Sequence, residues 1–296
     1  MRILVTGREG QLARSLVERA SAYPGLDLHF ASRPECDLAL EGSASTAIRA
    51  LQPDLIVSAA AYTAVDRAEA EPELARRINA DAVGEIAAAA SAIAAPLIHV
   101  STDYVFSGTG DAPVSEDARI APLGVYGRTK ADGEQHVRDA APDHLILRTA
   151  WVYSPFGANF VKTILRLAAE REEIAVVADQ VGSPTSALDL ADVILALAER
   201  RRIGDHAGWG ETYHAAGAGR ASWAEFAEAV MQESSAAGGP AARICPIATA
   251  QYPTPAARPA WSVLDSSQLR DHFGLSMPPW RESVAFVTQR LLGTLR

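Results

Sequence analysis

Residues 2–13 of the chain read Arg2-Ile3-Leu4-Val5-Thr6-Gly7-Arg8-Glu9-Gly10-Gln11-Leu12-Ala13. The first five predict a short buried strand, because they are mostly apolar and β-branched. A helical spacing of apolar residues then runs from Gln11 to about Ala22. Two glycines therefore lie between a strand and a helix, where a dinucleotide-binding fold has its phosphate turn. The spacing G-x-x-G-x-x-A is looser than G-x-G-x-x-G, and an ordinary strand–helix turn is the alternative.

Further short apolar runs follow this turn and alternate with segments of helical spacing. They predict strands at residues 27–31, 54–58, 96–100 and 144–148, and a long helix from residue 73 to about 95 that Pro72 opens. This alternation predicts an α/β fold with a Rossmann-type doubly wound parallel sheet. We expect residues 1–150 and about 172–205 to form that domain. Residues 151–171 and about 206–296, with a strand at 212–215, are expected to form a smaller substrate-binding α/β lobe.

Composition excludes several classes of protein. The chain has 296 residues, 48% of them apolar, which is enough for a large core and about two domains. A net charge of -9 argues against a nucleic-acid-binding protein. The two cysteines, Cys36 and Cys245, form no C-x-x-C pair, which fits a reducing compartment. The apolar run at the N-terminus and the Ala-rich stretch at 86–95 are too short for a signal peptide or a membrane span, so we expect a cytoplasmic protein without a membrane partner.

A tyrosine and a lysine lie four residues apart in Tyr126-Gly127-Arg128-Thr129-Lys130. On a helix, that spacing places both side chains on one face. An ammonium beside a phenol favours the phenolate, so we expect Lys130 to lower the pKa of Tyr126 toward the working pH. By itself the spacing is more typical of a solvated helix face, and its interpretation depends on the neighbouring motifs.

Hydroxyl side chains follow the fourth predicted strand, at Ser101 and Thr102. Ligands of open α/β sheets bind beyond the carboxyl ends of the strands, so these hydroxyls are candidates to hydrogen-bond a substrate carbonyl oxygen. A helix cap is the alternative, but the sequence predicts a loop to about Leu123 and no helix directly after Thr102.

Reduction of a ketone requires a hydride and a proton at its oxygen. A nicotinamide cofactor and a tuned phenol supply them without a metal.

Taken in this order, the motifs resemble the extended short-chain dehydrogenase/reductase family. The matching segments are G-R-E-G-Q-L, A-A-A-Y-T-A-V-D-R-A-E-A-E-P-E-L-A, S-T-D-Y-V-F-S-G-T-G and P-L-G-V-Y-G-R-T-K. The segments V-G-S-P-T and Y-P-T-P-A-A-R-P are more specific. They resemble the branch that reduces the C4 ketone of dTDP-4-dehydro-L-rhamnose to dTDP-L-rhamnose, a precursor of cell-surface polysaccharides such as the lipopolysaccharide O-antigen. The resemblance extends from residue 7 to about residue 259.

The resemblance implies a role for each matching residue. It makes Tyr126 the general acid and makes Lys130 the group that lowers the tyrosine's pKa and holds the nicotinamide ribose. Thr102 is implied to bind the reacting oxygen. The cofactor residues that we expect from the motifs and the resemblance together, besides Tyr126 and Lys130, are Gly7, Gly10, Gln11, Leu12, Arg33, Asp37, Leu38, Ala60, Ala61, Tyr62, Thr63 and Val100. The implied substrate residues, besides Thr102 and Tyr126, are Asp103, Trp151, Asn159 and Arg258.

Two arginines bear on the ligands. Arg33 follows the second predicted strand, where NAD-binding proteins usually have an acidic residue, so NADPH is expected and NADH stays possible. Arg258 is our candidate for the substrate diphosphate, because a guanidinium pairs well with phosphate oxygens. Each has a solvated loop arginine as its alternative, and Trp151 has core packing as its alternative to stacking on the sugar.

Three further expectations concern a metal, the oligomeric state and a buried histidine. Some family members hold Mg²⁺ through glutamates at a dimer contact, but Ser15 and Leu188 stand where we would look for them. We therefore expect no metal, and either a monomer or a homodimer. His99 lies in the fourth predicted strand and is expected to be a core or rim residue rather than a metal ligand.

Two other functions fit the same motifs. One is a non-catalytic NADP-binding regulatory subunit, against which the intact Thr102, Tyr126 and Lys130 argue. The other is an epimerase, dehydratase or reductase that acts on another nucleotide sugar, such as a different dTDP-4-keto-6-deoxy sugar. Asp103 beside Thr102 does not exclude a dehydratase, whereas the short chain and the Y-P-T-P-A-A-R-P segment favour the reductase.

Overall fold

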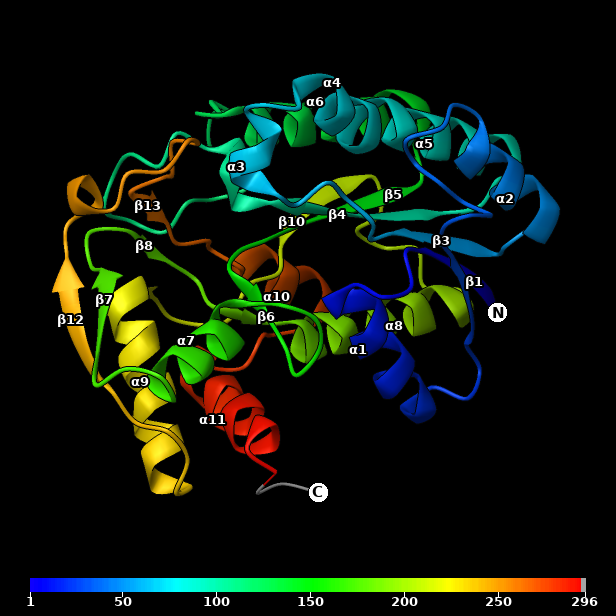
Figure 1. The fold of residues 1–296 in the computed structure, drawn as a ribbon. Helices are drawn as coiled ribbons and strands as arrows, with labels where there is room; N and C mark the ends of the chain where they lie inside the picture. Colours follow the sequence, from blue (N-terminus) through cyan, green and yellow to red (C-terminus); the bar gives the residue numbers. More distant parts are fainter. Residues whose placement is uncertain (294–296) are drawn as a thin grey trace.

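The computed structural model describes residues 1–293, and its centre is a six-stranded parallel sheet (Figure 1). The strands lie in the order β10-β5-β4-β3-β1-β2, and each runs parallel to its neighbours. From β1 the chain moves outward to β2 and then returns to β3 on the other side of β1, which creates a switch point. The predicted doubly wound fold is therefore confirmed. The strand bounds are β1 Arg2–Thr6, β2 Asp27–Ala31, β3 Leu55–Ser58, β4 Leu97–Thr102, β5 His144–Thr149 and β10 Glu211–His214.

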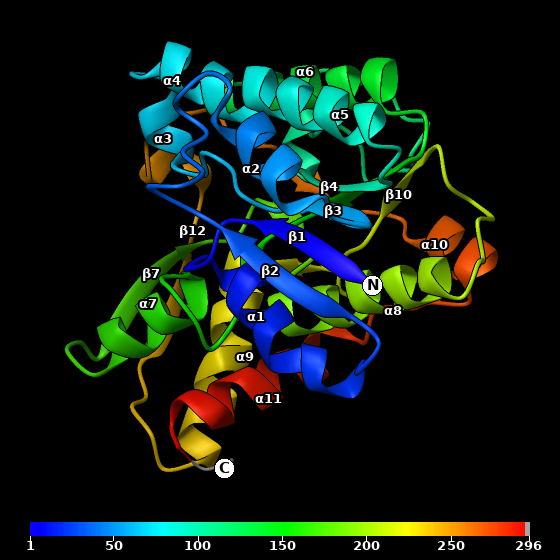
Figure 2. The same ribbon diagram turned by 90° about the vertical axis from the view of Figure 1, so that its right-hand side faces the viewer.

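Helices cover both faces of this sheet (Figure 2). Helices α1 (Gln11–Arg19) and α8 (Ala187–Arg202) share one buried core with the sheet, whereas α2 (Ser43–Leu51), α5 (Ala82–Ala92) and α6 (Val125–Ala140) share another. Successive strand residues point to opposite faces, so Val5 belongs to the first core and Leu4 to the second. Because both faces are buried, the strands read as continuous apolar runs.

Strand β10 lies in a different part of the fold from the one that the sequence predicts. We expected a strand at residues 212–215 in the smaller lobe, but β10 extends the main sheet beside β5, with Tyr213 opposite Leu147. The reason is burial: Tyr213 and Ala215 pack into the core beneath α8, which carries the chain back to this edge. The sheet therefore continues past the boundary expected at about residue 206.

The remaining segments form a second lobe with its own apolar core. Helices α7, α9 and α11 pack around Tyr153, Phe226 and Val284, beside a parallel pair of strands. The Ser222 hydroxyl and the Glu225 carboxylate form a capping box at the start of α9. The bounds in this lobe are β6 Val152–Tyr153, α7 Phe160–Ala168, β7 Glu173–Val177, β8 Val181–Gly182, β9 Thr185–Ser186, β11 Ala221–Ser222, α9 Trp223–Ala236, β12 Arg243–Ile247, β13 Trp261–Ser262 and α11 Trp280–Leu291.

The long helix predicted from residue 73 to 95 is interrupted by a turn of π-helix. It consists of α4 (Pro72–Arg76), the π-helical turn Arg77–Asp81 and α5. The turn brings the carbonyl of Asn79 against α6, where a Cβ on Gly133 would lie only 2.2 Å from that oxygen. Glycine on α6 therefore permits a close approach between the helix and the turn. Such turns recur at functional sites in other proteins.

Short helical segments complete the chain. They are the 3₁₀ turns Ala20–Ala22, Asp103–Val105 and Thr249–Gln251, and the helices α3 (Val65–Ala68) and α10 (Ser267–Phe273). In the described part of the chain, no helix has both the length and the apolar character needed to cross a bilayer.

Candidate active site

The glycine turn lies at the carboxyl end of β1 and leads directly into α1. Gly7 has φ +86°, in the region that favours glycine, and a Cβ there would approach the Cβ of Ala60 to 3.3 Å. Around Gly10, the N-cap of α1, no atom lies within 4 Å of where a Cβ would stand. No side chain caps α1, so the amides of its first turn remain available to an anion. These features fit the pyrophosphate of a dinucleotide.

The next part of the cofactor edge follows β3 and is held by internal hydrogen bonds. The Thr6 hydroxyl accepts from the backbone N–H groups of Ala59 and Ala60, both at 3.0 Å. Asn79 accepts from the Tyr62 amide at 2.8 Å and donates to the Tyr62 carbonyl and to Thr129 Oγ1, at 3.1 and 3.2 Å. Asn79 thus ties the edge that contains Ala60, Ala61, Tyr62 and Thr63 to helix α6. Sequence reasoning assigned Asn79 no role, since the π-helical turn that aims its side chain has no clear sequence signal.

The adenine end of the expected cofactor site lies beyond β2. Arg33 is exposed there, as a residue that meets a 2′-phosphate must be. The Asp37 carboxylate accepts from the Ala39 amide at 3.0 Å and shapes its own loop. The side chains of Leu38 and Leu12 are buried in the two cores that flank the sheet. For these two leucines only the backbone remains to meet a ligand.

Tyr126 and Lys130 occupy the first two turns of α6, and Gly127 brings that end of the helix close to the end of β4. A Cβ on Gly127 would lie 2.1 Å from the Tyr104 carbonyl oxygen. The rings of Tyr104 and Tyr126 meet edge to face at 5.4 Å. A hydrogen bond with the Thr102 hydroxyl lowers the pKa of Tyr126, but burial outweighs it and raises that pKa to about 12.

The expectation that Lys130 lowers the pKa of Tyr126 is therefore wrong for this structure. Lys130 Nζ donates instead to the Val100 carbonyl at 2.7 Å and lies 3.2 Å from His99 Nε2. Burial lowers the pKa of Lys130 to about 8, against the opposing influence of Glu134. Strand β4 supplies the partners of the ammonium.

Thr102 is the last residue of β4, and a 3₁₀ turn begins directly after it. Its hydroxyl accepts from the Tyr104 amide at 3.2 Å, so the helix-cap role that we had set aside is present. The same hydroxyl donates to the Asp103 carboxylate at 3.0 Å. Burial raises the pKa of Asp103 to about 6, although hydrogen bonds with Ser262 and Thr102 oppose the shift. Ser262 belongs to β13, so the two lobes meet at this carboxyl group.

Trp151 and Asn159 are placed differently from what the sequence suggests. The Trp151 indole stacks on Trp223, with ring centroids 3.6 Å apart and planes 5° from parallel, and it also packs closely on Gly182. At least one face of the Trp151 ring is therefore covered by protein, as its alternative role in core packing predicts. Sequence reasoning missed Trp223, which stands alone at the start of α9.

Asn159 caps α7 by accepting from the Lys162 amide at 3.2 Å. Its Nδ2 group donates to Gln11 Oε1 at 3.0 Å and to the carbonyls of Ser154 and Phe156. The side chain is thus fully engaged within the protein rather than directed at a substrate. Gln11, from the glycine turn, also donates to the Val152 carbonyl at 3.3 Å, so the turn is fastened to the second lobe.

Arg258 crosses between the lobes. Its guanidinium forms two hydrogen bonds with the Asp66 carboxylate, at 2.8 and 3.2 Å, and the Ala256 amide adds a third at 3.2 Å. The hydrogen bond with Arg258 is the main reason that the pKa of Asp66 lies below its ordinary value. Asp66 belongs to α3, whereas Arg258 belongs to the proline-rich segment 252–259. The two side chains together form an ion pair that spans the lobes.

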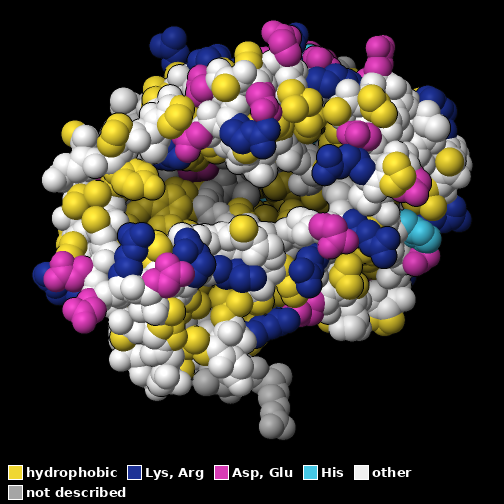
Figure 3. Space-filling model, in the orientation of Figure 1, with side chains coloured by type: hydrophobic (Ala, Val, Ile, Leu, Met, Phe, Trp, Pro, Cys, Tyr) yellow, Lys and Arg dark blue, Asp and Glu magenta, His cyan; other side chains and the backbone are white. Residues whose placement is uncertain are grey.

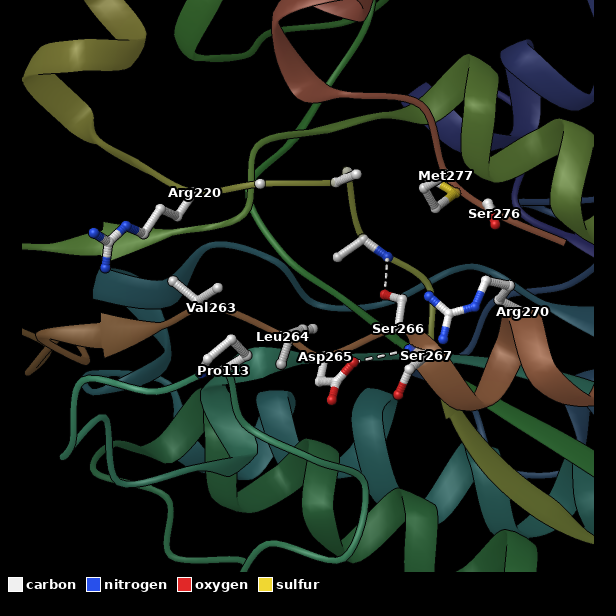
Figure 4. A pocket seen from close by; sticks show the side chains of 14 residues that line it. Pro113, Arg220, Val263, Leu264, Asp265, Ser266, Ser267, Arg270, Ser276 and Met277 are labelled. Carbon is white, nitrogen blue, oxygen red and sulfur yellow. Dashed lines mark hydrogen bonds between the residues drawn. The ribbon is translucent and has the colours of Figure 1, made fainter.

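Figure 3 shows the molecule hollowed between the sheet layer and the second lobe, with Lys and Arg side chains along the lower rim. A cavity of about 340 Å³ is lined by loops near the end of β10, among them residues Arg220, Asp265 and Arg270 (Figure 4). None of the residues that line it is a predicted site residue.

Metal ligands are not grouped in the described part of the chain. Residues 1–293 contain no cluster of three or more His, Cys, Asp or Glu side chains that could hold a metal ion. Ser15 is buried and donates to the Gln11 carbonyl at 2.8 Å, and Leu188 lies in the second-lobe core. These two positions thus serve packing and local hydrogen bonding.

Comparison with known proteins matches the whole chain to one family. Residues 1–292 match the family described as RmlD substrate binding domain. The chain is 45% identical to the dTDP-4-dehydrorhamnose reductase of Sinorhizobium fredii, covering 100% of this chain and 98% of the relative. It is 44% identical to that of Escherichia coli, with 99% of each chain covered. It is also similar to the crystal structure of the Bacillus anthracis dTDP-4-dehydrorhamnose reductase in complex with NADP, with a TM-score of 0.89, 35% identity and coverage of 98% of this chain and 99% of the other.

Proposed function

Because the chain belongs to the RmlD substrate binding domain family, whose relatives along its full length are dTDP-4-dehydrorhamnose reductases, we propose that it reduces the C4 ketone of dTDP-4-dehydro-L-rhamnose with NADPH. The observation that carries the proposal is the grouping of Thr102, Tyr126 and Lys130 at the carboxyl end of β4, on the same edge of the sheet as the glycine turn of β1, from which β3 separates it. The product would be dTDP-L-rhamnose, a precursor of cell-surface polysaccharides. The protein is an oxidoreductase by family.

NADPH would lie along the carboxyl ends of β1 and β3. The amides of Gly10 to Leu12 would hold the pyrophosphate and Arg33 the 2′-phosphate. Lys130 has three N–H donors, of which the Val100 carbonyl and His99 engage two within residues 1–293. The remaining donor suits the nicotinamide ribose. When bound, the cofactor supplies the hydride.

Tyr126 would deliver the proton to the C4 oxygen. A phenol with a pKa of about 12 is fully protonated at neutral pH, yet it is more acidic than the alcohol that forms. The raised pKa therefore suits an acid in the direction of reduction. Thr102 hydrogen-bonds with the same phenol, and its hydroxyl hydrogen, which the Asp103 carboxylate accepts in this structure, would turn to the C4 oxygen. Both groups act where charge develops, as a preorganised site should.

Arg258 would bind the substrate diphosphate at the mouth between the lobes. Asp66 already orients its guanidinium through two hydrogen bonds, so less rotational freedom is lost when the anion binds. Trp151 and Trp223 would offer the edges of their stacked rings to the sugar. We also propose that the enzyme acts in the cytoplasm, because both of its cysteines are free thiols, and that it is a monomer or homodimer.

The test is a steady-state assay of the purified chain with dTDP-4-dehydro-L-rhamnose and NADPH, in which the sugar product is identified by NMR. The proposal predicts that NADPH is consumed in proportion to dTDP-L-rhamnose formed. A regulatory subunit would bind NADPH without turnover, and an epimerase or dehydratase would convert a sugar without net consumption of NADPH. A different reduced sugar would overturn the assigned substrate but leave the reaction class intact.

A further inference from the structure

Besides the hydrogen bond from Lys130 to the Val100 carbonyl, two contacts between side chains join helix α6 to strand β4. His99 Nε2 lies 3.2 Å from Lys130 Nζ, and Ser101 Oγ donates to Glu134 Oε1 at 2.6 Å. His99 and Ser101 are two residues apart, so they share one face of the strand, and Lys130 and Glu134 are one helical turn apart. We call these two contacts the polar ladder. The first places an uncharged, buried histidine directly on the lysine of the active site.

The hydrogen-bonding capacity of the partners fixes the protonation state of His99. An ammonium has only donors, so the Nε2 atom of His99 must accept, and the ring proton must lie on Nδ1. That Nδ1 atom lies 3.2 Å from Ser58 Oγ, which can accept it. Ser58 lies directly opposite His99 in the β3–β4 pairing. All three side chains are buried, and burial together with the charge of Lys130 holds the pKa of His99 well below its ordinary value.

We propose that His99 is a positioning residue that fixes the ammonium of Lys130 and favours its protonated form. The neutral imidazole is itself held by Ser58, so strand β3 orients the ring and strand β4 supplies it. The inference rests on the role proposed for Lys130 and deepens it, because it explains what holds the lysine at its place. His99 would touch neither substrate nor reacting atoms.

Removal of the His99 imidazole, which accepts a hydrogen bond from Lys130, should change the pKa of Lys130. A buried ammonium that loses one of two internal hydrogen bonds is less stable in its charged form, so the pKa of Lys130 should fall. The other ionisable groups that act on this pair are Glu134 and Arg138 on α6 and His144 at the start of β5. None of them is altered by a substitution at His99.

The chain offers a direct measurement, since Lys130 and Lys162 are its only lysines. Full-length ligand-free protein labelled with ¹³C and ¹⁵N in lysine gives two side-chain signals, which the variant Lys162→Arg assigns. We expect Lys130 of the unaltered chain to titrate near 8, as burial predicts. In His99→Leu the pKa should fall by about one pH unit, a tenfold shift in the protonation equilibrium. His99→Gln, whose amide oxygen can replace Nε2 as acceptor, should restore most of it, and the exposed His206→Leu is the control.

The tautomer of His99 can be measured in the unaltered chain, so the proposal can be tested even if a variant does not fold. Histidine ¹⁵N shifts report the tautomer, and the proposal requires His99 to be neutral with its proton on Nδ1 at about pH 6 to 7, where Lys130 is an ammonium. A proton on Nε2, or equal shifts of Lys130 in His99→Leu and His99→Gln, would overturn it. Because no sugar or cofactor is present, the answer does not depend on the reductase assay. Failure of the proposed function would leave the titration unchanged.

Discussion

Glu134→Gln is the most demanding test of how helix α6 is held against the sheet. Glu134 is fully buried and accepts from Ser101, from two nitrogens of Arg148 and from Arg138, at 2.6 to 2.9 Å. Arg148 is itself 2% exposed. The glutamine keeps the shape but removes the charge, and it points an amide donor at guanidinium donors. The variant therefore leaves the charge of the buried Arg148 guanidinium without a full partner, and an uncompensated buried charge of this kind costs about 3–5 kcal/mol.

The assay is equilibrium urea unfolding of the variant and of the unaltered chain at neutral pH. The matched control is Glu170→Gln, which breaks an exposed ion pair with Arg166 four residues away and should change stability little. We expect the free energy of unfolding to fall by about 3–5 kcal/mol only in Glu134→Gln. A loss no larger than that of the control would show that the buried pair does not stabilise the fold.

The effect of Glu134→Gln on the free energy of unfolding should depend on pH. Hydrogen bonds from Arg148 hold the pKa of Glu134 below its ordinary value of 4.5, despite the burial that opposes them. A carboxyl group with a lowered pKa stabilises the fold fully above its unfolded value, and it loses that contribution as the pH falls through the folded value. The stability difference between the variant and the unaltered chain should therefore shrink below about pH 4. A difference that stays constant down to acid unfolding would contradict this account.

Three further predictions concern the site itself. Tyr126→Phe should lower kcat by about 10²–10⁴ while NADPH binding, followed by fluorescence, stays unchanged; a variant with full turnover would remove Tyr126 as the acid. Asp66→Ala should raise KM for the dTDP sugar about threefold to tenfold, because Arg258 loses its half-exposed partner, and KM for NADPH should not change. Asn79→Ala should raise KM for NADPH and lower Tm together, since three hydrogen bonds at the cofactor edge are lost. An effect on Tm alone would restrict Asn79 to a structural role.

The sheet and the order of the motifs could be predicted because they depend on local patterns. The bounds predicted for β2 at residues 27–31 are those observed, and apolar runs located the other strands of the main sheet to within two residues. Strand β10 was assigned to the wrong unit because its partner depends on where α8 returns the chain. That is a tertiary property with no local signal.

The candidate site was only partly predictable for the same reason. Thr102, Tyr126 and Lys130 stand in recognisable motifs, and the structure brings them to one edge of the sheet. Their electrostatics differ from expectation, because the pKa of Tyr126 depends on burial and the ammonium of Lys130 is bound by β4. Asn159 contacts the glycine turn through Gln11, which lies 148 positions away in the sequence. No spacing rule along the sequence predicts such a contact.

The polar ladder also determines how the chain can vary. A helix that packs on a sheet through apolar side chains alone can slide along its axis, since such contacts are not directional. Here a slip by one residue would break both the His99–Lys130 and Ser101–Glu134 contacts at once. The position of Tyr126 along the sheet is thus fixed by the contacts of α6 with β4, and not by the long connection that precedes α6. The exposed tip of that connection, residues 109–113, should tolerate insertions of several residues without moving the phenol.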